Sequence, residues 1–289
     1  MHRLTERDIE VLVDVYTYRY LTLPQITALH FPSIKTAYRR LQALVGGKFL
    51  KTFTVPSIMG RIFLLDSHGA EFVAAALQVE VNDLFWHRGQ KTPKNYYFLR
   101  HFLAINDFRI ALTHACHNSP ISLVGFIPEY IGEKTSKGEV KKYLRDKVCH
   151  MTSPARYISH TPDAAFALEK DGNKALFFLE IDRGTEIVND SEKGFLKAIV
   201  FYLNYWMSKQ FKKYEQDFGN AEFTLFRALF VTTSPRRLQN MREAVTHYDF
   251  PRKRAKQLLW GATDVISDNI FSPIWQAMDT TDETIYTIG

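Results

Sequence analysis

The spacing of apolar residues divides the start of the chain into short helices followed by two β-rich runs. Apolar positions recur with a helical period in three successive stretches. Each stretch begins after a residue of a helix-capping type, namely Thr5, Thr22 and Ser33. The β-rich runs 49–54 and 61–65 follow, joined by a segment with the Pro and Gly of a loop. Three short helices and a hairpin predict a winged helix-turn-helix, whose third helix lies in the DNA major groove.

The pattern then changes to long apolar helices and buried strands. A helix over roughly 96–116 is apolar around most of its circumference, which indicates burial or a homodimer contact. The run 121–131 is typical of a strand, and the charged segment 132–160 is predicted to be a surface loop. A hairpin over 162–186, a long helix, a strand, a helix and a last strand complete the order.

We therefore expect an α/β protein with a winged helix followed by a larger α/β domain. The expected domains are a DNA-binding domain over 1–85, a polar and basic linker over 86–95, and a domain over 96–289 with a central mixed sheet flanked by helices. No apolar run approaches the ~18 residues of a membrane span, and the start of the chain lacks a secretory signal. Two cysteines are too few for a disulfide framework, so we expect a cytoplasmic protein without a membrane partner.

Charge strengthens the DNA-binding interpretation of the first domain. The chain has a net charge of +6, and between Asp14 and Asp66 it contains no acidic residue at all. A surface of one sign attracts polyanions, so double-stranded DNA is the expected partner. Near the start of the third helix, base edges would be reached by Lys35, Thr36 and Arg39. Phosphates would be contacted by Arg40, Lys48, Lys51 and Arg61. The alternative is a protein-interaction module whose polar face is simply solvated.

Three carboxylates at one end of the second hairpin are candidates for chemistry. Asp171-Gly172 is a strong hairpin signal, and pairing around it places Asp163 directly opposite Glu180, with Asp182 on the same face. Facing carboxylates repel each other unless a cation lies between them, one of them is protonated, or basic groups neutralise them. Oxygen ligands suit Mg²⁺, so these three acids form a candidate metal site. In the alternative, Arg183 or a lysine neutralises them in a structural cluster.

The order of elements, with Pro162-Asp163 and Glu180-Ile181-Asp182 on paired strands, resembles the PD-(D/E)xK restriction-endonuclease-like fold. In that superfamily the acids bind Mg²⁺, and a lysine two positions after the second acid helps to activate water. Here Asp182 occupies the lysine position, so the resemblance implies that Lys193 or Lys197 would have to substitute for it.

The whole layout, with "TPDAAFALE" and "FFLEIDRGTE" after a basic winged helix, more closely resembles the replication-relaxation family of plasmids, phages and other mobile elements. The resemblance implies DNA binding in replication, relaxation or transfer, with replication or relaxase proteins of the same element as partners. We expect a degenerate nuclease-like domain with weak or no cleavage. Two alternatives stay open: an active Mg²⁺-dependent endonuclease or nickase, and a transcriptional regulator whose α/β domain dimerises or senses a ligand.

Overall fold

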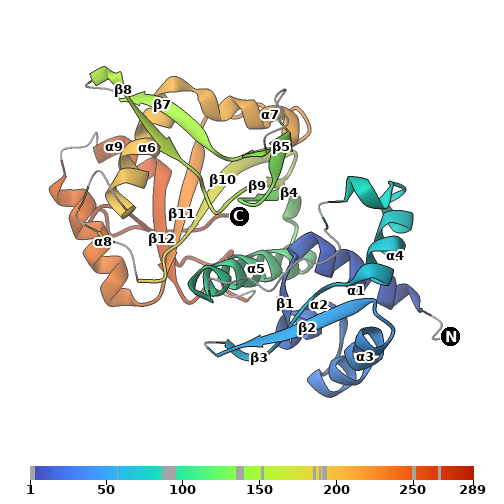
Figure 1. Cartoon of the computed structure of the whole chain (residues 1–289). Coiled ribbons are helices and arrows are strands. Elements are labelled where there is room, and N and C mark those ends of the chain that lie inside the picture. The colour runs from blue at the N-terminus through green and yellow to red at the C-terminus, as the bar shows by residue number, and fades with distance from the viewer. Residues whose placement is uncertain are drawn as a thin grey trace. The chain divides into compact units, whose positions relative to one another are not determined.

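The protein is an α/β protein with a large mixed sheet, as its sequence predicts, and Figure 1 shows its elements. The structure is a computed structural model that describes residues 4–56, 58–84, 86, 96–134, 140–150, 153–184, 187–188, 190, 194–248, 252–265 and 268–289. The chain divides into two compact units, Met1–Ile110 and Ala111–Gly289.

The N-terminal unit combines short helices with a small antiparallel sheet. Its elements are α1 (Glu6–Tyr18), β1 (Leu21–Thr22), α2 (Leu23–His30), α3 (Ile34–Gly46), β2 (Leu50–Val55), β3 (Ile58–Leu65), α4 (Ser67–Leu77), the 3₁₀ turn η1 (Val81–Asp83) and the first part of α5 (Tyr96–His117). The sheet has the order β1-β3-β2. The three predicted helices and the hairpin are therefore present, and the two-residue strand β1 is an addition that is too short to predict from periodicity.

Side-chain caps explain why these helices begin where they do. Thr5 and Asp8 form a capping box at α1, and Thr22 and Gln25 form a second one at α2. The Ser33 hydroxyl accepts a hydrogen bond from the backbone N–H of Thr36 and begins α3. Each cap satisfies backbone donors that have no partner within the helix.

The core of this unit lies between the helices and the sheet, and it differs from the prediction at one end of α3. The helical period of apolar residues in α3 predicts that Ile34, Leu41 and Leu44 all face the core. Leu41 and Leu44 are buried, whereas Ile34 is 55% exposed. Ile34 is the first residue of α3 and precedes the stretch of the helix that packs on the core, so its side chain remains at the surface.

The predicted linker over 86–95 lies largely outside the described residues. Trp86, its first residue, packs against the core of the N-terminal unit and donates a hydrogen bond from its indole N–H to the carbonyl of Leu65 at 3.2 Å. The first part of α5 also belongs to this unit, because the Asn106 amide donates to the carbonyls of Tyr18 and Tyr20 at 3.2 and 2.8 Å. The division between the two compact units falls inside α5.

The C-terminal unit is built around a seven-stranded sheet. After the end of α5 its elements are β4 (Ser122–Pro128), β5 (Gly132–Lys134), β6 (Val140–Lys142), β7 (Asp146–His150), β8 (Ser153–His160), β9 (Ala164–Lys170), β10 (Asn173–Ile181), α6 (Gly194–Ser208), η2 (Gln210–Lys213), α7 (Tyr214–Asp217), β11 (Phe226–Thr232), α8 (Pro235–His247), α9 (Arg252–Leu258), β12 (Leu259–Thr263), β13 (Trp275–Ala277) and β14 (Ile285–Tyr286). The strand order of the sheet is β14-β13-β12-β11-β10-β9-β4. Strands β10, β11 and β12 run parallel, and the outer strands pair antiparallel.

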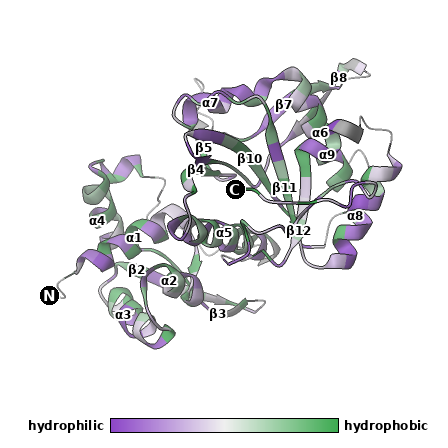
Figure 2. Cartoon of the chain, turned by 180° about the vertical axis from the view of Figure 1, so that it is seen from behind, coloured by the Kyte–Doolittle hydropathy of each residue, from purple (hydrophilic) through white to green (hydrophobic). Residues whose placement is uncertain are grey.

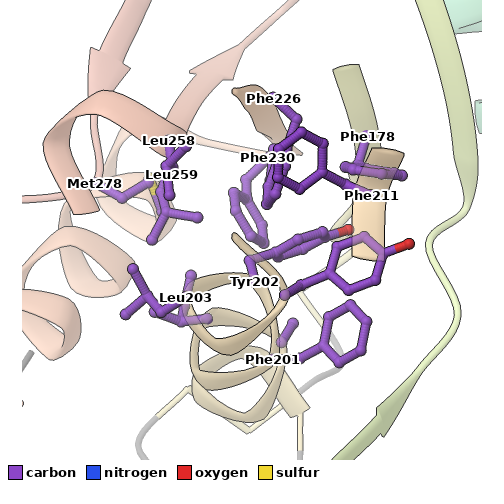
Figure 3. Packing of buried hydrophobic residues seen from close by; sticks show 14 of the residues in the cluster. Phe178, Phe201, Tyr202, Leu203, Phe211, Phe226, Phe230, Leu258, Leu259 and Met278 are labelled. Carbon is purple, nitrogen blue, oxygen red and sulfur yellow. The ribbon is translucent and has the colours of Figure 1, made fainter. Parts of the chain in front are cut away.

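Apolar strands and helices enclose the core on one face of this sheet. Phe178 of β10 and Phe230 of β11 lie in the same buried cluster as residues of α6, α8 and α9. In Figure 3, Tyr202 of α6 points towards Phe226 and Phe230, with ring centroids 5.7 and 6.3 Å away. In Figure 2, β10 is coloured mainly as hydrophobic residues, and much of α8 is coloured as hydrophilic residues.

The prediction of a surface loop over 132–160 is wrong for most of that segment. Strands β7 and β8 form an antiparallel ribbon in which Val148 lies opposite Ile158, and both side chains are buried against α6. The segment 135–139 lies outside the described residues. The ribbon was missed because its strands are short, charged and exposed on one side, so their apolar positions are too few to stand out.

Among the described residues, no helix combines the length and the apolar character that crossing a bilayer requires.

Candidate functional site

The three predicted carboxylates lie where β9 and β10 begin and end, at one edge of the central sheet. The observed pairing runs from Asn173 opposite Lys170 to Leu179 opposite Ala164, which is the predicted register. Beyond Ala164 the backbone N–H of Asp163 bonds the carbonyl of Leu179 at 3.0 Å, so the ladder departs from that register at its last step. Asp163 therefore adjoins Glu180 without following the regular ladder.

Glu180 is held by two side chains from different elements. Its Oε1 atom lies 2.6 Å from His160 Nε2 of β8, and it accepts a hydrogen bond from the Tyr202 hydroxyl of α6. Burial and the nearby charge of Asp163 raise the pKa of Glu180, while His160 and Tyr202 oppose the rise. A carboxyl group that holds a proton more readily than usual, between a histidine and a tyrosine, is a polar cluster inside the apolar core.

Asp182 lies in a different environment, although it is only two residues further along. Its carboxylate accepts two hydrogen bonds from Arg237 of α8, at 2.8 and 3.0 Å, and one from the Thr232 hydroxyl of β11 at 2.6 Å. Burial alone would raise its pKa, but these bonds outweigh the burial, and the pKa of Asp182 is lowered. Asp182 is thus an ionised carboxylate that is already neutralised by a bidentate arginine.

Asp163 turns its carboxylate towards the backbone. Its Oδ2 atom accepts a hydrogen bond from the N–H of Ile181 at 2.6 Å, and its own carbonyl accepts one from Glu129 N–H at 2.9 Å. The residue is only 9% exposed. These bonds tie the start of β9 to the end of β10 and to the end of β4.

In the structure each of the three acids has a hydrogen-bond partner within the protein. Asp182 is occupied by Arg237, Glu180 by His160 and Tyr202, and Asp163 by a backbone donor. Mg²⁺ in proteins is held by one or two carboxylates together with water or substrate oxygens. No group of three or more His, Cys, Asp or Glu side chains in the described part of the chain is placed to hold a metal ion.

Two lysines were predicted to replace the missing catalytic lysine, and the structure describes one of them. Lys193 lies outside the described residues. Lys197 of α6 is half-buried and lines a pocket with β8 residues. Asp182 is neutralised as the structural alternative suggested, but by Arg237 rather than by Arg183 or a lysine.

Sequence reasoning missed Arg237, His160 and Tyr202, the partners of the acids. A signal for Arg237 exists, because it follows the Ser234 cap of α8 directly after a buried strand. Parallel strands end at the same edge of a sheet, so residues that follow β11 lie near those that follow β10. His160 and Tyr202 carried no comparable signal, since neither belongs to a recognisable motif.

The second candidate region is the polar surface of α3 and the β2–β3 hairpin. Lys35 and Arg39 of α3 and Arg61 of β3 are exposed. Arg61 donates to Gln42 Oε1 at 3.0 Å, and its guanidinium carbon lies 5.9 Å from the centre of the exposed Tyr38 ring. Helix and hairpin are therefore joined on this surface by a cation, an amide and an aromatic ring.

The other predicted DNA-contacting residues differ in how exposed they are. Lys48 is exposed at a positive φ of 59° after α3, whereas Lys51 and Thr36 are partly buried. Arg40 is bound to Asp8 of α1, with its Nε 2.6 Å from Oδ1 and a second nitrogen 2.5 Å from Oδ2. Because Asp8 is buried, this ion pair fastens α3 to α1, and it raises the pKa of Arg40 while lowering that of Asp8.

Comparison with protein families gives a match over much of the chain. The family model described as replication-relaxation matches residues 12–220, which is well over half of the chain. The chain belongs to the replication-relaxation family. No curated protein and no solved structure matches it.

The replication-relaxation match covers both candidate regions. It includes α3 and the β2–β3 hairpin, and it includes Asp163, Glu180 and Asp182. It ends before β11 and α8, so the Thr232 and Arg237 partners of Asp182 lie beyond the matched residues.

Proposed function

We propose that the protein binds double-stranded DNA through its N-terminal unit and acts in the replication or relaxation of mobile-element DNA. The unit has the order α1-β1-α2-α3-β2-β3 with a β1-β3-β2 sheet, which is the order of elements in a winged helix-turn-helix. Membership of the replication-relaxation family supports the process. In this proposal α3 enters the major groove, and the hairpin lies against the flanking backbone.

The observation that carries the proposal is the set of exposed cations on α3 and the hairpin, within a span that has no acidic residue. Lys35 and Arg39 lie on the exposed side of α3, and Arg61 lies beside it on β3. Asp8 of α1 contacts α3, but its charge is neutralised by Arg40. A surface with this charge attracts DNA phosphates.

We assign the predicted contacts by their position in the N-terminal unit. We assign Lys35, Thr36 and Arg39 to the major groove, because they occupy the first half of α3. Phosphate contacts fall to Lys48, Lys51 and Arg61, which follow α3 in the hairpin region. Arg40 is assigned to the fold instead, since its guanidinium is engaged by buried Asp8.

A gel-shift titration at two salt concentrations tests DNA binding. The double variant Lys35→Ala/Arg39→Ala should weaken duplex binding by roughly 1–3 kcal/mol per lost contact and reduce the steepness of the salt dependence. A matched control removes two exposed lysines of the other unit, Lys170→Ala/Lys209→Ala, so the change in net charge is the same. Equal affinity in wild type and the α3 variant, or an equal loss in the control, would contradict the assignment of α3.

For the C-terminal unit we propose a PD-(D/E)xK nuclease-like domain whose carboxylates have a structural role. The β9–β10 hairpin next to parallel β11 and β12 supports the fold. The contacts of the acids support the loss of cleavage, because Asp182 replaces the expected lysine and is bound by Arg237. Metal-dependent hydrolysis needs open acids to hold the ion and a basic group to help generate the nucleophile.

A supercoiled-plasmid nicking assay in Mg²⁺ and Mn²⁺ tests whether the C-terminal unit has lost cleavage activity. We expect wild-type protein to leave the plasmid intact, as do Asp163→Ala and Glu180→Ala. Nicking by wild type that both substitutions abolish would establish the nuclease instead and would reject the structural role.

A further inference from the structure

A small polar pocket in the C-terminal unit lies between the β7–β8 ribbon and α6. Its volume is about 240 Å³, and its polar lining includes His150 and Arg156 from the ribbon, Lys197 from α6 and Tyr248 after α8. Ser159 adds a hydroxyl group from β8. None of the described residues that line the pocket is an Asp or a Glu.

Lys197 makes this pocket unusual. Its side chain is half-buried, and within the described residues its ammonium group makes no hydrogen bond or ion pair. Most lysines either extend fully into water or pair with a carboxylate, because withdrawing an ammonium group from water costs free energy. Among the described lining residues this partly buried lysine has no acidic counter-charge, and a bound anion would supply one.

We propose that this pocket binds a phosphate group. Arg156 and Lys197 supply positive charge from two different elements, and His150 supplies a ring nitrogen donor. Charge-assisted hydrogen bonds of this type are the strong ones in phosphate recognition. Ile158 and Val200 line the same pocket and limit the access of water on one side.

The volume of the pocket limits the size of the ligand that it can hold. Pockets that enclose drug-sized molecules have volumes of roughly 300–1,000 Å³, so a pocket of this size suits a phosphate group rather than a complete nucleotide. The phosphate belongs either to a DNA backbone or to a free anion. In the first case the pocket gives the C-terminal unit its own contact with DNA, an assignment that rests on the function proposed above.

Thermal unfolding of the full-length chain in inorganic phosphate tests the pocket. The melting temperature of wild type should rise by roughly 3–5 °C when phosphate exceeds its Kd about tenfold, relative to chloride of equal ionic strength. Lys197→Gln should weaken the apparent affinity for phosphate about tenfold or more, because one charge-assisted contact is lost. Lys170→Gln, an exposed lysine on the β9–β10 hairpin, is the matched control and should behave as wild type.

Arg156→Gln is the second variant, and it covers the case in which Lys197→Gln fails to fold. Arg156 is exposed on the ribbon, so its substitution should leave the fold intact while weakening phosphate binding. A rise that chloride reproduces, or one that Arg156→Gln and Lys197→Gln both retain, would overturn the proposal.

Duplex DNA separates the two sources of phosphate. If the DNA backbone occupies the pocket, Lys197→Gln lowers duplex affinity and reduces the salt slope by about one, as expected for one lost phosphate contact. If duplex affinity is unchanged while phosphate binding is lost, the ligand is a free anion. Lys35→Ala/Arg39→Ala should keep the phosphate response in full, so failure of the α3 assignment is distinguishable from failure of this pocket.

Discussion

At the scale of single residues, the contact between Asp182 and Arg237 explains why this buried carboxylate stays ionised. Two parallel hydrogen bonds and the Thr232 hydroxyl satisfy the carboxylate, which is 8% exposed. An aspartate at this place would otherwise add an uncompensated charge to a buried strand end. The same bonds that stabilise the charge also occupy the oxygens that a cation would use.

Arg237→Ala should therefore destabilise the protein. It leaves a buried carboxylate without its partner, and we expect a loss of about 3 kcal/mol in the free energy of unfolding, near the lower end for a broken buried pair because Arg237 is partly exposed. Urea denaturation followed by circular dichroism measures the change. The neighbouring Arg236→Ala removes the same charge from an exposed position and should stay within about 0.5 kcal/mol of wild type. Equal losses in both variants would contradict a specific role for the pair.

Glu180 and Asp182 should give opposite trends with pH. The pKa of Asp182 is lowered, so the stability that wild type has over Asp182→Asn is present above the ordinary value of 3.8 and is lost as pH falls below it. The pKa of Glu180 is raised, so the stability that wild type has over Glu180→Gln is complete below 4.5 and declines as pH rises.

Urea titrations of wild type and both variants between about pH 3 and pH 7 measure these differences. Parallel pH curves for the two substitutions would show that the carboxylates share one environment, in conflict with their separate partners.

At the scale of elements, the β9–β10 hairpin shows how much of the strand pairing local sequence signals can predict. Asp171 and Gly172 adopt φ values of 50° and 76°, and the pairing around them follows the predicted register as far as Leu179 opposite Ala164. Turn chemistry is the local signal for this register, because both strands are buried in continuous runs and show no apolar alternation. The last step at Asp163 depends on side-chain contacts and was not predictable in this way.

Substitution of Gly172 tests the turn. A Cβ atom there would meet nothing within 4 Å, so the cost of Gly172→Ala comes from the left-handed backbone alone. We expect a loss of roughly 1 kcal/mol in the free energy of unfolding. Asp171→Asn should be nearly neutral, because asparagine tolerates the same conformation. A neutral Gly172→Ala variant in thermal denaturation would show that the turn contributes little to pairing.

Other elements and contacts could not be predicted from the sequence, for physical reasons. The β7–β8 ribbon has too few buried positions to show alternation, and Ile34 is apolar yet precedes the part of α3 that packs. Arg237 lies 55 residues from Asp182, so only the parallel arrangement of β10 and β11 brings the two together. Caps and turns are local and were predicted, whereas these contacts depend on the order of strands in the sheet.

At the scale of the whole molecule, two units share one helix, α5. Its first part is tied to the N-terminal unit, since Gln25 donates to the Leu103 carbonyl at 3.0 Å and to Asp107 Oδ1 at 2.7 Å. Burial raises the pKa of Asp107, and the bond from Gln25 partly offsets that rise. The start of α5 is thus a component of the N-terminal core.

The stability of N-terminal fragments should depend on whether they include α5. A fragment over 4–118, which keeps α5, should unfold cooperatively, whereas a fragment over 4–86 loses the partners of Gln25 and exposes the core residues that α5 covers. We expect a lower melting temperature for the shorter fragment by circular dichroism. Equal melting temperatures would place the boundary before α5, where the polar segment suggested it.

The position of α6 has a consequence for how the C-terminal unit opens. The sheet covers one side of this helix and the β7–β8 ribbon packs on it as well, so residues on nearly all of its faces from Phe195 to Tyr205 are buried. Its amide protons can then meet deuterated solvent only when the core comes apart as a unit. In hydrogen–deuterium exchange, α6 should be among the slowest segments, with an opening free energy close to that of global unfolding. The more solvent-facing α8 should exchange earlier, as the first layer to loosen.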